Sequence, residues 1–202
     1  MKTLKFRWTG IRPVIMSNPQ TVNIANPYAI ASRRINNELK AARKKQAEER
    51  MQELAKEQQQ NDFAASAYWQ DGGFYLPDTV IIACLKQAAQ GMKKGKDIDR
   101  SVIMTETEAP IKTLASFKTL ESAFADKRYV LTCPCKIPPR TGALTFKARC
   151  MMPTGWQVEF SLEFDEKDLP AKVVEEINET AGLRVGVGGW RPKFGRFTSK
   201  AI

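Results

Sequence analysis

The chain has 202 residues, 43% of them hydrophobic, which suits one elaborated domain or two small ones with a real core. Lysine and arginine exceed the acids by ten, which favours polyanionic partners, nucleic acid first and anionic membrane second. Histidine is absent, which excludes histidine-based triads, general bases and metal ligands, so an enzyme is the weaker expectation.

The N-terminal third predicts a strand followed by a helical insertion. Residues 3–8 alternate apolar and polar side chains, as a half-buried strand does, and residues 17–28 are typical of a long loop. Residues 29–62 then form a helical insertion or arm that is rich in Ala, Arg, Lys, Glu and Gln. Its thin apolar stripe predicts one long, mostly solvated helix, whose Arg43–Lys45 run fits a solvated face and a basic arm equally well.

The middle of the chain predicts a turn, a short strand and a well-patterned helix. Residues 63–76 hold an aromatic cluster split by an Asp-Gly-Gly turn, and a helix with a broad apolar face starts near Asp78. Lys93, Lys94 and Lys96 follow that helix. Cations at a helix C-terminus complement the helix dipole, and the same lysines could extend a track for phosphates.

Two long alternating segments, residues 144–152 and 156–164, predict a β-hairpin with one buried and one polar face. On the polar face, Lys147 and Arg149 would meet Glu159 and Glu163 across the hairpin. Shorter strands are expected at residues 101–105 and 128–136.

The last elements are a helix from about Leu169 to Ala181, capped by Asp168, and a closing strand over residues 193–198. The resulting order of elements approximates β-α-β-β-α-β with additions. We therefore predict a single α+β domain over residues 1–202, with a ferredoxin-like (RRM-like) antiparallel sheet, helices on one face, and the long helical insertion after the first strand.

The four cysteines predict packing rather than metal binding. Cys133 and Cys135 form C-x-C, which is neither a zinc-ribbon nor a redox spacing, and Cys84 and Cys150 stand alone. Free cysteines are among the most buried residue types, so we expect buried thiols in a reducing compartment. No metal and no cofactor are predicted. Because no apolar run is long enough for a membrane span and the N-terminus is charged, we expect a soluble protein that remains inside the cell.

The run GLRVGVGGWRPKFGRF, residues 182–197, is the most unusual stretch of the chain. It holds five glycines, three arginines and a lysine without a single acid. It fails the dinucleotide and Walker patterns and follows a helix instead of a strand, which excludes both nucleotide loops. Glycines can bring backbone N–H groups close to a phosphate, and the aromatic side chains can stack on bases. The alternative is a tight helix-to-strand connection with buried aromatics.

This run looks like the terminal signature of a family of bacteriophage and prophage proteins that end near GxGxWRPRFGRF. Weaker similarity extends over GIRPVIM, FYLPDTVIIACLKQAAQGMKKGKD and WQVEFSLEFD. The glycine-rich ending also resembles, more distantly, the loop of RAMP proteins, the ferredoxin-like RNA binders of CRISPR backbones. The resemblance implies a RAMP-like fold, a glycine-rich loop against a nucleic-acid backbone and, since histidine is absent, binding without cleavage. The phage resemblance implies the cytoplasm of an infected bacterial host.

The combined expectation is a phage-encoded, non-catalytic nucleic-acid-binding protein acting in replication or recombination. Single strands are favoured as the partner, and homo-oligomers could form along the strand. The predicted contact residues are Arg184, Gly186, Gly188, Gly189, Trp190, Arg191, Lys193, Gly195, Arg196, Lys93, Lys94, Lys96, Arg7 and Arg12. Two alternatives stay open: a protein-interaction role for the helical arm, and a metal-dependent nuclease that uses carboxylates such as Asp97 and Asp99.

Overall fold

The computed structural model describes residues 1–136 and 144–202, which group into two compact units. Unit 1 contains Met1–Ile15, Tyr68–Lys118 and Met152–Ile202, and unit 2 contains Met16–Ala67 and the described part of Thr119–Met151. Each unit is therefore assembled from segments that are distant in sequence. The assignment of one domain to the whole chain stays a prediction.

Unit 1 is built on an antiparallel sheet whose described strands run in the order β10-β1-β9-β6-β4-β3, with β5 also paired to β9. The bounds are β1 Lys2–Gly10, β3 Trp69–Gln70, β4 Gly73–Pro77, β5 Val102–Met104, β6 Glu108–Lys112, β9 Gln157–Phe164 and β10 Phe197–Ala201. A further short strand, β2, covers Val14–Ile15. The alternation predicted for the first strand is confirmed, because Phe6 and Trp8 are buried on one side of β1.

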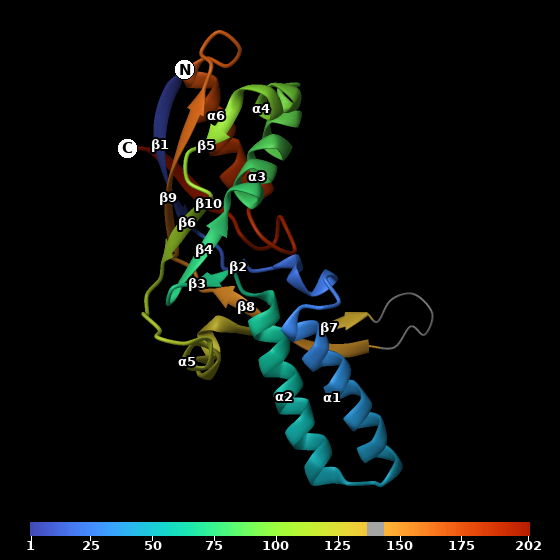
Figure 1. Cartoon of the computed structure of the whole chain (residues 1–202). Coiled ribbons are helices and arrows are strands. Elements are labelled where there is room, and N and C mark those ends of the chain that lie inside the picture. Colours follow the sequence, from blue (N-terminus) through green and yellow to red (C-terminus); the bar gives the residue numbers. More distant parts are fainter. Residues whose placement is uncertain (137–143) are drawn as a thin grey trace. The chain divides into compact units, whose positions relative to one another are not determined.

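The helices of unit 1 lie on the buried face of this sheet (Figure 1). They are α3 Asp78–Gln90, α4 Gly95–Ser101 and α6 Ala171–Thr180, and a π-helical turn, Ala181–Val185, continues α6. The buried indole of Trp8 donates a hydrogen bond to Asn178 Oδ1 of α6 at 3.0 Å, which satisfies two polar groups inside the core. The prediction of antiparallel sheets combined with helices is confirmed.

Unit 2 combines helices with a small antiparallel strand pair. Its described elements are α1 Pro27–Lys44, α2 Glu48–Ser66, α5 Leu120–Ala125, β7 Val130–Lys136 and β8 Leu144–Met152, with 3-10 turns at Pro19–Val22 and Lys127–Tyr129. The Asn26 side chain caps α1 by accepting a hydrogen bond from the Tyr28 amide, and Pro27 stands at the first turn.

The helical insertion is a hairpin of two helices and not one long helix. The chain leaves the helical conformation after Lys44, and Gln46 has a φ of 54°, so α2 runs back beside α1 (Figure 1). This reversal buries Ile35 and Ala42 of α1 together with Leu54 of α2. A single solvated helix would leave both halves of the apolar stripe in water, whereas the hairpin packs one half against the other.

The predicted hairpin of residues 144–152 and 156–164 is wrong in its pairing, although both segments are strands. β8 pairs with β7, while β9 pairs with β1, β5 and β6. The acid Glu159 accordingly lies beside Lys5, Arg7 and Lys112, and not beside the cations of β8. Alternation of side chains defines the buried face of a strand but not its neighbour, and this is why the error arose.

The C-terminal boundaries also shift. Asp168 does not cap α6: its carboxylate accepts a hydrogen bond from Ser101 Oγ at 2.6 Å, and the helix begins after Pro170. The closing strand starts at Phe197 and not near residue 193, because residues 186–196 fold into a loop. Of the cysteines, Cys84 and Cys150 are buried free thiols and Cys133 is buried too, as expected, while the Cys135 side chain lies outside the described part.

Candidate functional site

The glycine-rich loop between α6 and β10 is fixed to the body of unit 1 by backbone hydrogen bonds. The amide of Gly189 donates to Ile15 O at 2.8 Å, and that of Gly195 donates to Pro13 O at 2.7 Å. Within the loop, the Val187 amide donates to Gly195 O at 2.8 Å, and at its start the Gly186 amide donates to Ala181 O at 2.7 Å. These donors are used inside the protein, so the loop is a folded structure that is supported by Pro13 and by Ile15 of β2.

The protein's own close backbone packing explains the glycines. Gly195 has a φ of +74°, and a Cβ there would lie 1.7 Å from Val187 O. Gly188 has a φ of +81°, and its Cβ would lie 2.5 Å from Ile15 O. No other residue type fits such contacts, because the colliding atoms belong to the backbone. The predicted phosphate contacts of Gly186, Gly188, Gly189 and Gly195 stay predictions; the conformation itself requires Gly188 and Gly195.

Three cations surround an open hollow on this loop, which we call the basic hollow. Its volume is ≈ 590 Å³, and its lining is Arg12, Pro13, Pro192, Lys193, Phe194 and Arg196. Lys193 and Arg12 are exposed, and the Arg196 side chain is oriented by a hydrogen bond from its Nε to Pro192 O at 3.1 Å. Among residues 1–136 and 144–202, no acid forms an ion pair with these three cations, so their charges remain available to an anion.

The segment before β2 supplies Arg12 to the hollow. The amides of Ile11 and Arg12 both donate to Arg196 O, at 2.9 and 3.1 Å, and Trp156 Nε1 donates to Arg12 O at 2.9 Å. These contacts bring the N-terminal Arg-Pro pair beside the C-terminal one. Sequence reasoning found Arg12 but missed Pro13 and Pro192; the repeated Arg-Pro dipeptide was the available signal.

One large aromatic side chain stands exposed on the loop. Trp190 keeps 46% of its surface accessible and lies edge-to-face with Phe194, with ring centroids 6.1 Å apart. Its φ of 54° is uncommon for a non-glycine residue and costs conformational energy, which is found most often at functional positions. Phe197, in contrast, is fully buried and stacks on Trp8 at 3.9 Å, so it belongs to the core.

Arg191 is turned toward the buried Cys84. Burial raises the pKa of that thiol to about 12, while the charge and the hydrogen bond of Arg191 act in the opposite direction. The thiol is therefore protonated at neutral pH, and its Sγ donates to Gly186 O at 3.1 Å. Arg191 is exposed, and it does not belong to the lining of the basic hollow.

The remaining predicted residues do not gather at the basic hollow. Arg184 is exposed in the π-helical turn, and π-helical turns are frequent at functional sites. Lys94 pairs with Asp97 at 3.0 Å. Lys93 and Lys96 are exposed beyond the end of α3, and neither belongs to the lining of the basic hollow.

Arg7 faces the open side of the sheet, where it shares the carboxylate of Glu159 with two lysines. Arg7 Nε donates to Glu159 Oε1 at 2.9 Å, and Lys5 and Lys112 place their Nζ atoms 3.1 and 3.3 Å from the same carboxylate. Hydrogen bonds from Lys5, Arg7 and Lys112 lower the pKa of Glu159 to about 2. We call these four residues the sheet-face cluster.

The carboxylates considered for a nuclease are paired with lysines. Asp97 binds Lys94, and Asp99 lies 2.5 Å from Lys86 Nζ. In the described part of the chain, no three His, Cys, Asp or Glu side chains gather in a way that would hold a metal ion. No helix there is long and apolar enough to cross a membrane.

A scan against protein-family models and a search of the curated proteins find no match to this chain.

Proposed function

We propose that this protein binds nucleic acid, single strands in preference, through the basic hollow and Trp190. The observation that carries the proposal is the convergence of Arg12, Lys193 and Arg196 on one open hollow without a neutralising acid in the described residues. A cation of the protein that binds a phosphate releases a condensed counterion from the nucleic acid. This release increases the affinity, and the increase becomes smaller as the salt concentration rises. We propose binding without catalysis, so the proposal does not include cleavage of the nucleic acid.

The preference for single strands rests on where the aromatic surface lies. Trp190 is half exposed beside the hollow, and stacking of a base on an aromatic ring contributes about 1–3 kcal/mol in single-stranded complexes. A duplex keeps its bases stacked inside and offers only its backbone. The open sheet face, the usual platform of RRM-like proteins, presents ion-paired residues such as Arg7 and Glu159 instead.

The strand order of unit 1 supports the ferredoxin-like, RAMP-like part of the proposal. That plan places the first strand between the last and the third, and the second strand beyond the third. Here β1 lies between β10 and β9, with β5 and β6 beyond β9, and α3 and α6 occupy the two helix positions. The basic hollow then belongs to the loop between the second helix and the last strand.

The biological setting is a further part of the proposal and rests on the terminal run of residues 182–197. Its likeness to the phage signature supports an origin in a phage or prophage, a place in the cytoplasm of the bacterial host, and a role in replication or recombination. Assembly of several copies along one strand would be expected for a protein of this kind.

A shift assay with labelled single- and double-stranded oligonucleotides at two salt concentrations tests the proposal. We expect the wild type to bind the single strand with a steep salt dependence. The variant Arg12→Glu, Lys193→Glu, Arg196→Glu should lose affinity by about tenfold or more and lower the salt slope by roughly two, since each phosphate contact contributes about 0.7 on single strands.

A matched control separates the hollow from net charge. The variant Lys118→Glu, Lys167→Glu, Lys172→Glu changes the charge equally at three exposed lysines of unit 1 outside the hollow. If both triple variants lose affinity alike, binding is non-local and the site is wrong. If the wild type binds no oligonucleotide at low salt, the function is wrong.

A further inference from the structure

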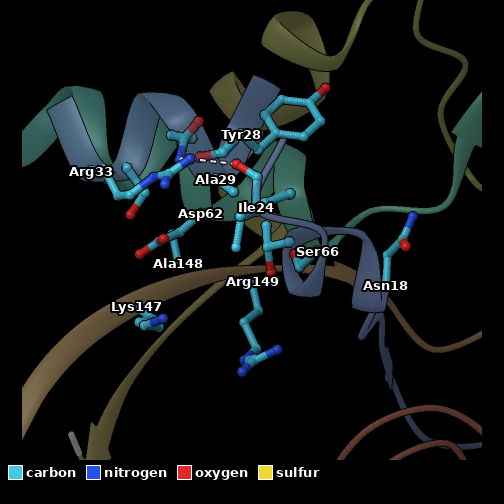
Figure 2. A pocket seen from close by; sticks show the side chains of 14 residues that line it. Asn18, Ile24, Tyr28, Ala29, Arg33, Asp62, Ser66, Lys147, Ala148 and Arg149 are labelled. Atoms are coloured by element: carbon cyan, nitrogen blue, oxygen red, sulfur yellow. Dashed lines mark hydrogen bonds between the residues drawn. The ribbon is translucent and has the colours of Figure 1, made fainter. Parts of the chain in front are cut away.

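Unit 2 contains a second polar cavity, which is separate from the basic hollow in composition and in chain segments. It has a volume of ≈ 330 Å³ and is lined by the 3-10 turn near Asn18, by α1, by α2 and by β8 (Figure 2). Its charged lining residues are Arg33, Asp62, Lys147 and Arg149. A volume of this size accommodates a small metabolite and exceeds that of a single inorganic anion.

The charged lining residues lie on three elements: Arg33 on α1, Asp62 on α2, and Lys147 and Arg149 on β8. Lys147 and Arg149, two positions apart, extend from the same side of β8 (Figure 2). Asp62 belongs to α2, where its carboxylate accepts a hydrogen bond from Gln58 Nε2 at 2.8 Å. Burial raises the pKa of Asp62, while the charges of Lys147 and Arg149 and the Gln58 hydrogen bond oppose that rise.

These charges act on one another without touching. Among the residues that the structure describes, no ion pair within 4.0 Å joins Asp62 to either cation of β8. Asp62, Lys147 and Arg149 all belong to the lining of the cavity.

Within the described residues, one buried side-chain nitrogen of the cavity lining lacks a hydrogen-bond partner. Ser66 Oγ accepts from the Cys150 amide at 2.8 Å, and Arg33 donates to Ile24 O, so these two groups already have partners. Arg149 Nε, in contrast, is buried and has no hydrogen-bond acceptor within the described residues. A buried donor without an acceptor is uncommon, and a cationic one calls for an anion.

We propose that this cavity binds a nucleotide. Lys147 and Arg149 hold its phosphate, and Asp62 accepts a hydrogen bond from an amino or hydroxyl group of its base or sugar. A nucleotide joins an anionic end to N–H and O–H donors, which matches two cations opposite one carboxylate. Inorganic phosphate would meet only the cations and be repelled by Asp62. The nucleotide is either free or the phosphorylated end of a polynucleotide, since both present the same groups.

Calorimetric titration of the full chain tests this site. The probes are the four ribonucleoside 5′-monophosphates, with inorganic phosphate and adenosine as comparators. We expect at least one monophosphate to bind about tenfold more tightly than inorganic phosphate, which corresponds to about 1.4 kcal/mol. Absence of binding for all four at millimolar concentration overturns the proposal.

Variants assign the roles. Lys147 is exposed, so Lys147→Ala should leave the fold intact, and it should weaken the binding of every phosphate-bearing probe by about tenfold. Arg149→Ala should weaken binding equally, provided that circular dichroism shows this variant to be folded. Asp62→Asn should reduce the preference for nucleotide over phosphate. The control Lys56→Ala changes an exposed lysine of α2 outside the cavity and should change nothing. Equal affinity of Lys147→Ala and the wild type would refute the assignment.

Two further comparisons separate the sources of the ligand and the two sites. A trinucleotide with a 5′-phosphate that binds much more tightly than the monophosphate identifies a polynucleotide end, and similar affinities identify a free nucleotide. The variant Arg12→Glu, Lys193→Glu, Arg196→Glu should retain monophosphate binding. If that variant loses it, the bound nucleotide lies at the basic hollow and the cavity of unit 2 is not the site.

Discussion

The basic hollow and the sheet-face cluster each bring three cations together within unit 1, yet their electrostatics differ. In the sheet-face cluster, Lys5, Arg7 and Lys112 all pair with Glu159, so one of the three positive charges is compensated within the protein. In the hollow, three cations converge on open space. The comparison teaches that a net charge of +10 does not locate a partner site. The ion pairs among the described residues distinguish these two groups of cations.

The largest expected effect comes from removing the loop that builds the hollow. Gly195→Ala forces a Cβ against Val187 O at a positive φ, so we expect a loss of about 3 kcal/mol or more in unfolding free energy. Binding should fall with it. Chemical denaturation measures the change.

Gly155→Ala is the matched control, because Gly155 also has a positive φ, of +92°, but nothing lies within 4 Å of its Cβ position. Its cost should be limited to backbone strain of about 1 kcal/mol. Equal destabilisation by the two variants would contradict the close packing that we assign to the loop.

An intermediate effect is expected from the exposed ring beside the hollow. Trp190→Ala should weaken single-strand binding by about 1–3 kcal/mol, because a stacked base loses its platform. Trp190→Phe should restore most of the affinity while duplex binding changes little in either variant. Fluorescence anisotropy with labelled oligonucleotides provides the measurement. Unchanged affinity in Trp190→Ala would remove stacking from the mechanism.

The smallest effect is expected at the sheet-face cluster. The folded-state pKa of Glu159, about 2, lies below its ordinary value of 4.5. Its contribution to stability is therefore present above about pH 4.5 and is lost as the pH falls toward 2. Melting temperatures between pH 7 and pH 2.5 should show a slightly smaller acid-induced drop for Glu159→Gln than for the wild type.

The same substitution sharpens the comparison with the hollow. Glu159→Gln leaves Lys5, Arg7 and Lys112 without their acid, so low-salt binding of oligonucleotides should increase modestly. Glu163→Gln, on the same strand and the same face, changes the charge equally without touching the cluster. If both variants increase binding alike, net charge and not local compensation controls the sheet face.

Local features were predictable from the sequence because they depend on neighbouring side chains. Alternation identified β1, β8 and β9 as strands, and the broad apolar face located α3. The loop at residues 182–197 stood out because glycine and arginine gathered there without acids. These patterns show which face of an element is buried and which residues carry charge.

Pairing and compensation were decided only by the tertiary structure, because both depend on residues far apart in the chain. In the fold, β9 pairs with β1 and not with β8. This pairing places Glu159 beside Arg7, with which it forms an ion pair. Tertiary structure also folded the helical insertion back on itself and brought Arg12 beside Arg196. The sequence by itself determined that a glycine-rich, basic loop exists. Only the tertiary structure showed that Gly188 is needed for the close approach to the Ile15 backbone and that Arg12 lines one hollow with the cations of the loop, because these residues are far apart in the chain.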